Sequence, residues 1–155
     1  MYDNGYFSQK GLLFDSSAAT YLYGYLYYDD AYCTVEALTF YTFGTYSVGS
    51  TNSVGTELNM TVQRVTSTPK NSTEATVNNI DVACGFSNWV ANVEKNITGL
   101  ICYGNQVAAA GSTTYQIFKI ENDKLYLGDL SSGNANSPTT RPTLMGTTDF
   151  VKSAN

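Results

Sequence analysis

The residues that most often carry out catalysis are scarce in this chain. Its 155 residues include no His, which removes the Ser–His and Cys–His nucleophiles and most general bases that act near neutral pH. Asp29 and Asp30 are adjacent carboxylates, but neighbours on a strand point to opposite faces, so a turn explains the pair better. No Ser or Lys lies in a recognisable nucleophile motif. We therefore expect a protein that is not an enzyme, with a small enzyme using carboxylates alone as the weaker alternative.

Metal-binding patterns are also weak. Three dispersed cysteines without His do not form a zinc site. The turn at residues 121–123 and the pair Asp29 and Asp30 offer oxygen atoms, but neither has the spacing of a calcium loop. We expect no metal and no cofactor.

The cysteines favour one disulfide. Cys84 and Cys102 flank the segment that contains the only helical spacing, and a bond between them would close a loop of about 18 residues and stabilise the fold by about 3 kcal/mol. Two free buried thiols are the alternative. Cys33 is then left over, either buried or paired with a cysteine in a segment before Met1.

Tyrosines recur at every second position of the stretch Thr20–Tyr28. This alternation is typical of a strand, and it places Tyr21, Tyr23, Tyr25 and Tyr27 on one face. Tyrosine hydroxyls need partners or water, so such a row suits a half-wet surface. Three interpretations stay open: a ladder that only holds the sheet together, the lining of a ligand cavity, and a surface that contacts a protein or glycan. With Phe40 and Phe118, the four tyrosines are our candidate cavity lining.

The rest of the chain predicts further short strands and little helix. Alternating segments follow at residues 32–41, 44–49 and 58–65, and the segments 114–120 and 124–127 form a hairpin with a turn between them. Phe86, Trp89, Val90 and Val93 predict one short helical turn around residues 85–95, with Trp89 as a plug at a barrel end rather than a ligand platform. About eight strands in one domain, residues 1–155, predict an antiparallel barrel or a sandwich. Residues 1–10 and 152–155 are expected to be irregular.

Charge and sequence motifs bear on the compartment and the partners. The net charge is −5, and the eight Lys and Arg residues are scattered singly, which argues against nucleic acid and anionic membranes as partners. No apolar run approaches the roughly 20 residues that span a bilayer. Asn59, Asn71 and Asn96 begin N-glycosylation sequons. Together with the cysteines they favour a secreted or surface protein, and because the start lacks signal-peptide features, we expect a processed or truncated form.

The chain also resembles lipocalin-like (calycin) domains. The resemblance rests on Cys84-Gly85 with Trp89, on residues 96–99 with Cys102, and on the hairpin over 115–129 followed by residues 141–143; the segments 28–34 and 44–46 are similar to the early hairpin of such barrels. It implies an eight-stranded, up-and-down antiparallel barrel, usually extracytoplasmic, often with a central pocket for a small apolar molecule. The Gly-x-Trp motif near the N-terminus is absent, and the first strand with its cysteine is missing or altered. That departure would leave Cys33 unpaired and the barrel incompletely closed.

Two functions follow from these observations. The first is a secreted, non-enzymatic protein that holds a small hydrophobic or aromatic ligand in its barrel. The alternative is a structural or adhesive surface glycoprotein subunit that associates with other copies through exposed strands or a tyrosine patch. An interior lined by tyrosines favours the first, and a filled interior with a large contact surface favours the second.

Overall fold

The protein is mostly antiparallel β-structure with one short α-helix. The computed structural model describes residues 2–3 and 6–151. Its large sheet has the order β1 (Tyr2–Asp3), β2 (Tyr6–Asp15), β3 (Thr20–Tyr28), β4 (Glu36–Thr51), β5 (Thr56–Pro69), β9 (Thr113–Glu121), β10 (Lys124–Gly128) and β11 (Met145–Val151), with β6 (Lys95–Asn96) paired to the end of β5. A separate two-stranded ribbon joins β7 (Ile101–Cys102) to β8 (Asn105–Gln106).

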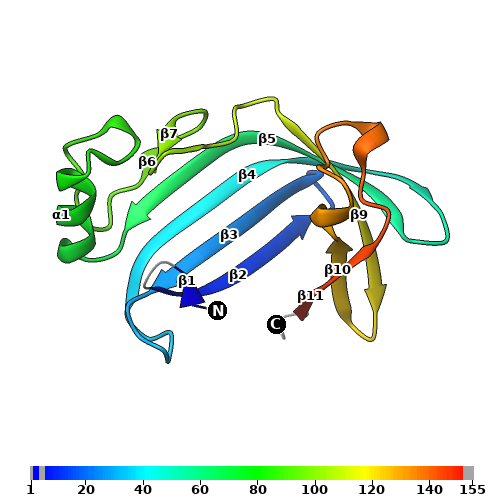
Figure 1. Cartoon of the computed structure of the whole chain (residues 1–155), viewed down its shortest axis with the longest axis horizontal. Helices are drawn as coiled ribbons and strands as arrows, with labels where there is room; N and C mark the ends of the chain where they lie inside the picture. Colours follow the sequence, from blue (N-terminus) through cyan, green and yellow to red (C-terminus); the bar gives the residue numbers. More distant parts are fainter. Residues whose placement is uncertain (1, 4–5, 152–155) are drawn as a thin grey trace.

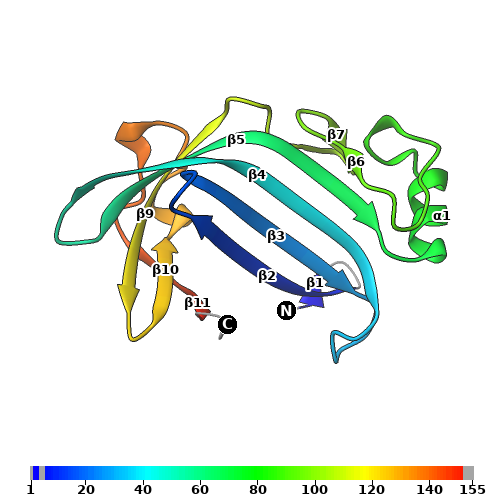
Figure 2. The same cartoon turned by 180° about the vertical axis from the view of Figure 1, so that it is seen from behind.

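The large sheet curls into a half-barrel (Figure 1). Strands β2 to β5 form one broad curved wall, and β9, β10 and β11 bend away from it to form a second wall. Figure 2 shows the same arch from behind, with β2 and β11 as the two outer strands of the walls. Within the described chain the strand order does not close on itself, so the sheet is an open half-barrel and a closed barrel of eight strands is not confirmed.

The tyrosine-rich strand forms as expected, because its side chains alternate between two different environments. In the register of β3, Tyr21, Tyr23, Tyr25 and Tyr27 lie opposite Gly44, Thr42, Phe40 and Leu38 of β4. Directly opposed residues project from the same face of a sheet. The four tyrosines and Phe40 therefore share one face of the wall.

That face is the concave one. The rings of Tyr23 on β3 and Phe150 on β11 lie 6.3 Å apart, although four strands separate β3 from β11 in the order of the sheet. Only side chains that point into the hollow of a curled sheet can meet in this way. The tyrosine row therefore lines the inside of the half-barrel.

The helix lies elsewhere than the sequence predicted. α1 spans Ser72–Ile80, and a 3₁₀ turn, η1, spans Ala83–Gly85. The expected helical turn around residues 85–95 is wrong: residues 86–94 form turns and irregular structure, with Asn92 at a φ of 62°. Phe86 and Trp89 pack inward from an irregular segment, so their spacing imitates a helix without forming one.

The N-terminal prediction also needs correction. Residues 6–10 belong to β2, which pairs with β3 from Phe7↔Tyr28 to Asp15↔Thr20. Hydrogen bonding to β3 orders this polar segment, which has too few apolar residues to be recognised from its sequence. The predicted irregular tail at 152–155 lies outside the described residues.

The densest hydrophobic core lies at the α1 end of the half-barrel. It consists of Val62, Val65, Ala75, Ala83, Cys84, Trp89, Ile97 and Cys102, with Phe40 packed against it. Val65 lies opposite Thr42 and so projects from the tyrosine face. Residues 70–112, which connect β5 to β9, therefore pack on the concave side and fill the α1 end of the half-barrel. We call this segment the plug. Trp89 is buried there, and its Nε1 donates to the carbonyl of Ala83 at 3.1 Å.

A second connecting segment, residues 129–144 between β10 and β11, packs on the opposite face of β5 and β9. Arg141 donates to the carbonyl of Gln116 at 2.7 Å and to Oδ1 of Asn59 at 2.9 Å. Its guanidinium also lies 5.5 Å from the ring of Tyr115 and 3.7 Å from Glu57. This well-bonded arginine has a structural role.

Candidate functional site

The concave aromatic row is the candidate site. The rings of Tyr23 and Tyr25 meet edge to face at 5.0 Å, and those of Tyr25 and Tyr27 stack at 6.3 Å. Tyr27 also meets Phe40 at 5.9 Å. These spacings are those of favourable aromatic pairs. β3 supplies Tyr23, Tyr25 and Tyr27, and β4 supplies Phe40. Phe150 of β11 meets Tyr23 across the hollow, so the five rings form one continuous aromatic surface.

The hydroxyls of this surface can both donate and accept hydrogen bonds. Tyr23 donates to the hydroxyl of Tyr25 at 3.0 Å. Burial raises the pKa of Tyr23 far above its usual value, and the hydrogen bond to Tyr25 raises it further. Both rings are half-buried. The row therefore offers ring faces for apolar contact and hydroxyls that can orient a ligand's polar atom.

One cation borders the aromatic row. The ammonium of Lys10, on β2, lies 5.1 Å from the centre of the Tyr25 ring, within the range of a cation–π contact. Lys10 is exposed, and it lies opposite Tyr25 in the β2–β3 register. The open side of the row therefore carries a positive charge that a ligand's acidic group can meet.

The other end of the row meets a buried carboxylate. The ring of Tyr6 lies 6.2 Å from that of Tyr27, and its hydroxyl donates to Glu74 on α1 at 2.8 Å. Glu74 is buried, and within the described chain it has no ion-pair partner. Burial raises the pKa of Glu74, the hydrogen bond from Tyr6 partly offsets this, and the charge of Asp29 adds to the increase. Burial and then the bond to Glu74 raise the pKa of Tyr6 to about 12.

Tyr21 belongs to the row but is closed off. Its side chain is buried and its ring lies over Gly44, where an added Cβ would come within 2.6 Å of the ring. Beside it, Phe14 and Tyr46 meet edge to face at 4.8 Å. Tyr21 therefore packs the wall rather than presenting a surface to a ligand.

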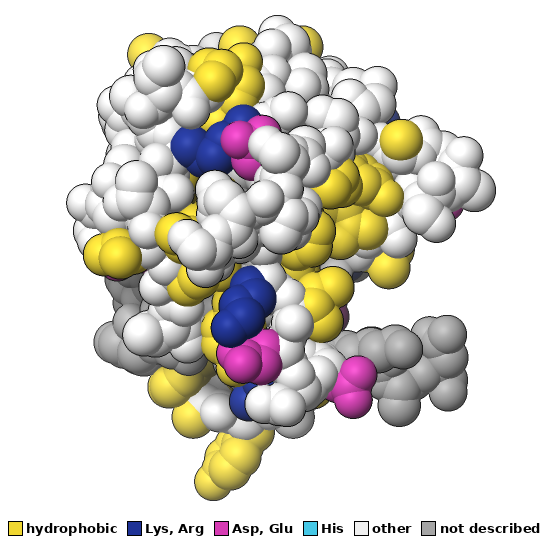
Figure 3. All heavy atoms as spheres, turned by 90° about the vertical axis from the view of Figure 1, so that its right-hand side faces the viewer, with side chains coloured by type: hydrophobic (Ala, Val, Ile, Leu, Met, Phe, Trp, Pro, Cys, Tyr) yellow, Lys and Arg dark blue, Asp and Glu magenta, His cyan; other side chains and the backbone are white. Residues whose placement is uncertain are grey.

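Phe118 lies apart from the tyrosine row. It lines a shallow surface hollow of about 360 Å³ beside the tip of the β4–β5 hairpin, together with residues 51–56 and 119–120. Figure 3 views the molecule from this side and shows hydrophobic side chains at the surface, next to neighbouring acidic and basic ones. Of the six candidate lining residues, the structure thus brings together the four tyrosines and Phe40 and places Phe118 in a separate hollow.

The carboxylates of the first long loop have structural roles. Asp30 accepts hydrogen bonds from the backbone N–H groups of Tyr32, Thr34 and Val35, which holds its pKa below the usual value. Asp29 accepts from the side chain of Asn71 at 3.2 Å. No group of three metal-ligating side chains is found in the part of the chain that the structure describes.

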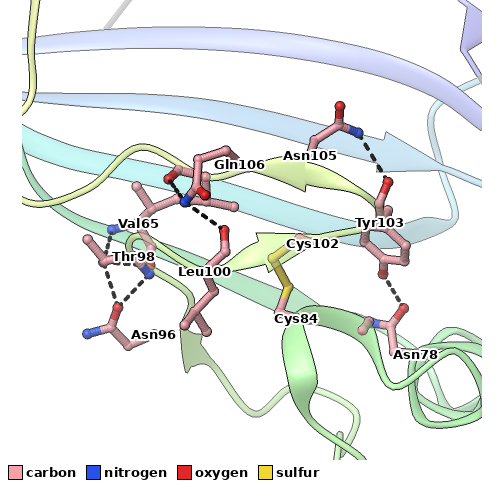
Figure 4. The surroundings of a disulfide bond; sticks show 12 residues. Val65, Asn78, Cys84, Asn96, Thr98, Leu100, Cys102, Tyr103, Asn105 and Gln106 are labelled. Atoms are coloured by element: carbon pink, nitrogen blue, oxygen red, sulfur yellow. Dashed lines mark hydrogen bonds between the residues drawn. A yellow bond between two sulfur atoms is a disulfide. The ribbon is translucent and has the colours of Figure 1, made fainter.

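The predicted disulfide is confirmed. Cys84 of η1 is bonded to Cys102 of β7 (Figure 4). Next to it, Tyr103 donates its hydroxyl to Asn78 of α1, and Thr98 joins Asn96 to the backbone of Val65. These contacts fix the plug to both α1 and β5. Cys33 is a free, half-buried thiol.

The three sequons lie in different settings. Asn59 is held on β5 by Arg141 and Ser47, and Asn71 caps α1 through its Oδ1 while its Nδ2 donates to Asp29 and to the carbonyl of Glu36. Asn96 is exposed, and its Oδ1 accepts from the hydroxyl of Thr98, the third residue of the sequon. Its Nδ2 makes no hydrogen bond within the described chain. Asn96 is therefore the most exposed of the three sequon asparagines.

Sequence reasoning missed four residues of the site. Tyr6 lies in the segment 1–10, which the sequence predicts to be irregular, and the sequence predicts no element at Glu74. Lys10 lies directly opposite Tyr25 in the β2–β3 register, within a segment predicted to be irregular, whereas Phe150 of β11 meets Tyr23 because the whole sheet curls. Alternation along β11 places Phe150 on a face of the sheet, but it does not indicate that the two walls approach each other.

Comparisons with known proteins add no family assignment: no protein family model matches the sequence, and a comparison with curated proteins found no significant match. In the described residues, no helix has both the length and the apolar character needed to span a bilayer.

Proposed function

We propose that this protein is a secreted, non-enzymatic binding protein of lipocalin-like architecture that holds a small hydrophobic or aromatic ligand on its concave tyrosine face. The observation that carries the proposal is the continuous row of Tyr23, Tyr25 and Tyr27 with Phe40 and Phe150 inside the half-barrel. Ligand sites generally combine apolar walls with a few polar groups that fix orientation. Here the hydroxyls of Tyr23 and Tyr25 and the ammonium of Lys10 are those groups.

Secretion and glycosylation belong to the same proposal. The Cys84–Cys102 disulfide supports an oxidising compartment. Asn96 is the expected glycan site, because it is exposed and its sequon already has a bonded Asn and Thr pair. Peptide mapping after expression through a eukaryotic secretory pathway would test this, with Asn59 as the internal comparison.

A titration with the neutral aromatic fluorophore N-phenyl-1-naphthylamine tests the binding face. We expect saturable binding with one site per chain. Tyr25→Ala should weaken it by about tenfold, since one aromatic contact contributes roughly 0.5–1.5 kcal/mol beyond its buried area. Tyr32→Ala is the matched control, because Tyr32 is 88% exposed on a loop outside the concave face.

Native mass spectrometry of material from its source separates the two candidate functions. A monomer that carries a small molecule supports the binding protein. Binding that is equally strong in Tyr25→Ala and the unmodified chain, or a stable dimer without a bound molecule, would instead favour the self-associating surface subunit.

A further inference from the structure

A buried carboxylate without a cationic partner lies at the α1 end of the aromatic row. Glu74 is 6% exposed. Within the described chain its carboxylate accepts one hydrogen bond, from the hydroxyl of Tyr6 to Oε2, and it takes part in no ion pair. Buried carboxylates usually have a cationic partner or several donors. Oε1 of Glu74 has no donor from the described residues, so it can accept one from a ligand.

The charged groups around Glu74 are also negative. Burial raises the pKa of Glu74 most, and the charges of Asp29 and Asp81 raise it further, against the hydrogen bond from Tyr6. Burial and then the charge of Glu74 raise the pKa of Tyr103, so this hydroxyl lies in the same electrostatic field. A water molecule is neutral and would leave the negative charge uncompensated, whereas a bound cation would offset it.

A second unsatisfied group lies one helical turn away. Asn78 is 0% exposed, and its Oδ1 accepts from the hydroxyl of Tyr103 at 2.5 Å, as Figure 4 shows. Its Nδ2 is buried and has no hydrogen-bond partner among the described residues. Residues four apart on a helix are neighbours on one side of it, so Glu74 and Asn78 project from α1 together. An unpaired donor beside an unpaired acceptor indicates a site for a polar group.

Aromatic rings lead to this polar site from the concave face. The ring of Tyr6 lies 6.2 Å from that of Tyr27, which lies 5.9 Å from that of Phe40. Figure 1 shows α1 beside the end of the sheet where β2 begins and β3 ends. At the other end of the row, the ammonium of Lys10 lies 5.1 Å from the centre of the Tyr25 ring. The row therefore has a positive charge at one end and a negative charge at the other.

We propose that the ligand of the concave face is a protonated amine with an aromatic body, bound with its ammonium group at Glu74 and its rings along Tyr27 and Phe40. This inference rests on the proposed function, because it names the class of ligand that the aromatic row holds. The ammonium donates to Oε1 of Glu74, and an oxygen atom of the same ligand can accept from Nδ2 of Asn78. Repulsion from Lys10 favours the same orientation.

Three naphthalene compounds that differ only in their polar group test the inference. Naphthylethylamine, naphthylethanol and naphthylacetate displace N-phenyl-1-naphthylamine at neutral pH, and fluorescence reports their affinities. We expect the amine to bind at least about tenfold more tightly than the alcohol, with the acetate weakest. Glu74→Gln removes the charge and keeps an acceptor for Tyr6, so it should bring the ratio of the amine and alcohol affinities to about one. Glu121→Gln, at an exposed position, is the matched control and should keep the ratio.

Carbon NMR of the unmodified protein provides a second measurement that needs no variant. Saturating amine should lower the pKa of Glu74, because a nearby cation favours the ionised carboxylate, and saturating alcohol should not. The groups that face Glu74 and must be included in the analysis of this titration are Tyr6, Asp29, Asp81 and Tyr103.

The inference and the proposed function fail in different ways. If neither the fluorophore nor any of the three compounds binds, the proposed function is wrong and the inference with it. If the fluorophore binds but the amine and the alcohol bind equally, only the inference is overturned. A preference for the amine that survives in Glu74→Gln, or an unchanged pKa of Glu74 in saturating amine, also overturns it. A preference lost in Glu74→Gln and kept in Glu121→Gln supports it.

Discussion

At the residue scale, Gly44 shows how closely the aromatic wall is packed. A Cβ at this position would lie 2.1 Å from the carbonyl oxygen of Thr61 and 2.6 Å from the ring of Tyr21. The first of these atoms is backbone and cannot easily move. We expect Gly44→Ala to lower the free energy of unfolding by about 1–3 kcal/mol, the usual cost of overpacking, as measured by urea denaturation.

Gly11 provides the matched control for this substitution. It lies on β2, and no atom lies within 4 Å of an added Cβ. Because Gly weakens a strand relative to Ala, Gly11→Ala should be neutral or stabilise by up to about 1 kcal/mol. Equal effects of the two substitutions would show that Tyr21 and Thr61 do not restrict Gly44.

Glu74 makes the stability of the folded protein depend on pH. Because burial raises its pKa above the ordinary value of 4.5, the folded protein keeps this proton to a higher pH than the unfolded chain does. The contribution of Glu74 to stability is therefore present at low pH and is lost as pH rises from about 4.5 through the folded-state pKa. At neutral pH, the buried carboxylate destabilises the fold.

Glu74→Gln should remove this dependence and keep an acceptor for the hydroxyl of Tyr6. We expect the unfolding free energy of the variant, relative to that of the unmodified protein, to increase between pH 4.5 and pH 7. Urea denaturation at several pH values measures it. Glu121→Gln, at an exposed position, is the control and should follow the unmodified protein. Parallel curves for all three proteins would contradict the assignment.

At the scale of elements, the disulfide stabilises the plug. It joins η1 to β7 across a separation of 18 residues, so loop closure predicts a loss of about 3 kcal/mol when both Cys84 and Cys102 are replaced by Ser. Cys33→Ser, which removes a free thiol, should change stability little. Urea denaturation compares them. A loss in Cys33→Ser as large as that in the double variant would rule out this explanation.

Strands β3, β4, β5, β9 and β10 were largely predictable from the sequence, because each contains an alternating pattern. β3 occupies the predicted range Thr20–Tyr28, and the hairpin of β9 and β10 lies where its two alternating segments indicated. The segments at 32–41 and 44–49 proved to be parts of one strand, β4, which begins only at Glu36. Asp30 holds the preceding loop through bonds to backbone N–H groups, which alternation does not reveal.

The helix was missed because its buried face is unusually polar. Glu74 and Asn78 are buried, whereas Val77 and Ile80 are exposed, which reverses the pattern that identifies amphipathic helices. One local signal was present: Asn71 caps the helix by accepting a hydrogen bond from the N–H of Glu74, and Asn followed three residues later by Glu is a helix-start pattern. Within the candidate site, the register of β3 was predictable, but the contacts made by Tyr6 and Phe150 were not.

At the scale of the whole molecule, an open barrel should have unequal local stability. β4 pairs with β3 and β5 over most of its length, and β5 pairs with β4, β6 and β9. Among the described residues, Ser8–Asp15 of β2 and the whole of β11 pair with a strand on one side only. Native-state hydrogen exchange should therefore show the slowest amides in β4 and β5. The fastest strand amides should be at alternate positions of Ser8–Asp15 and in β11, because those groups have no strand partner among the described residues. Uniformly slow exchange across β2 and β11 in the isolated monomer would mean that these strands are paired in solution, and the half-barrel would then be closed.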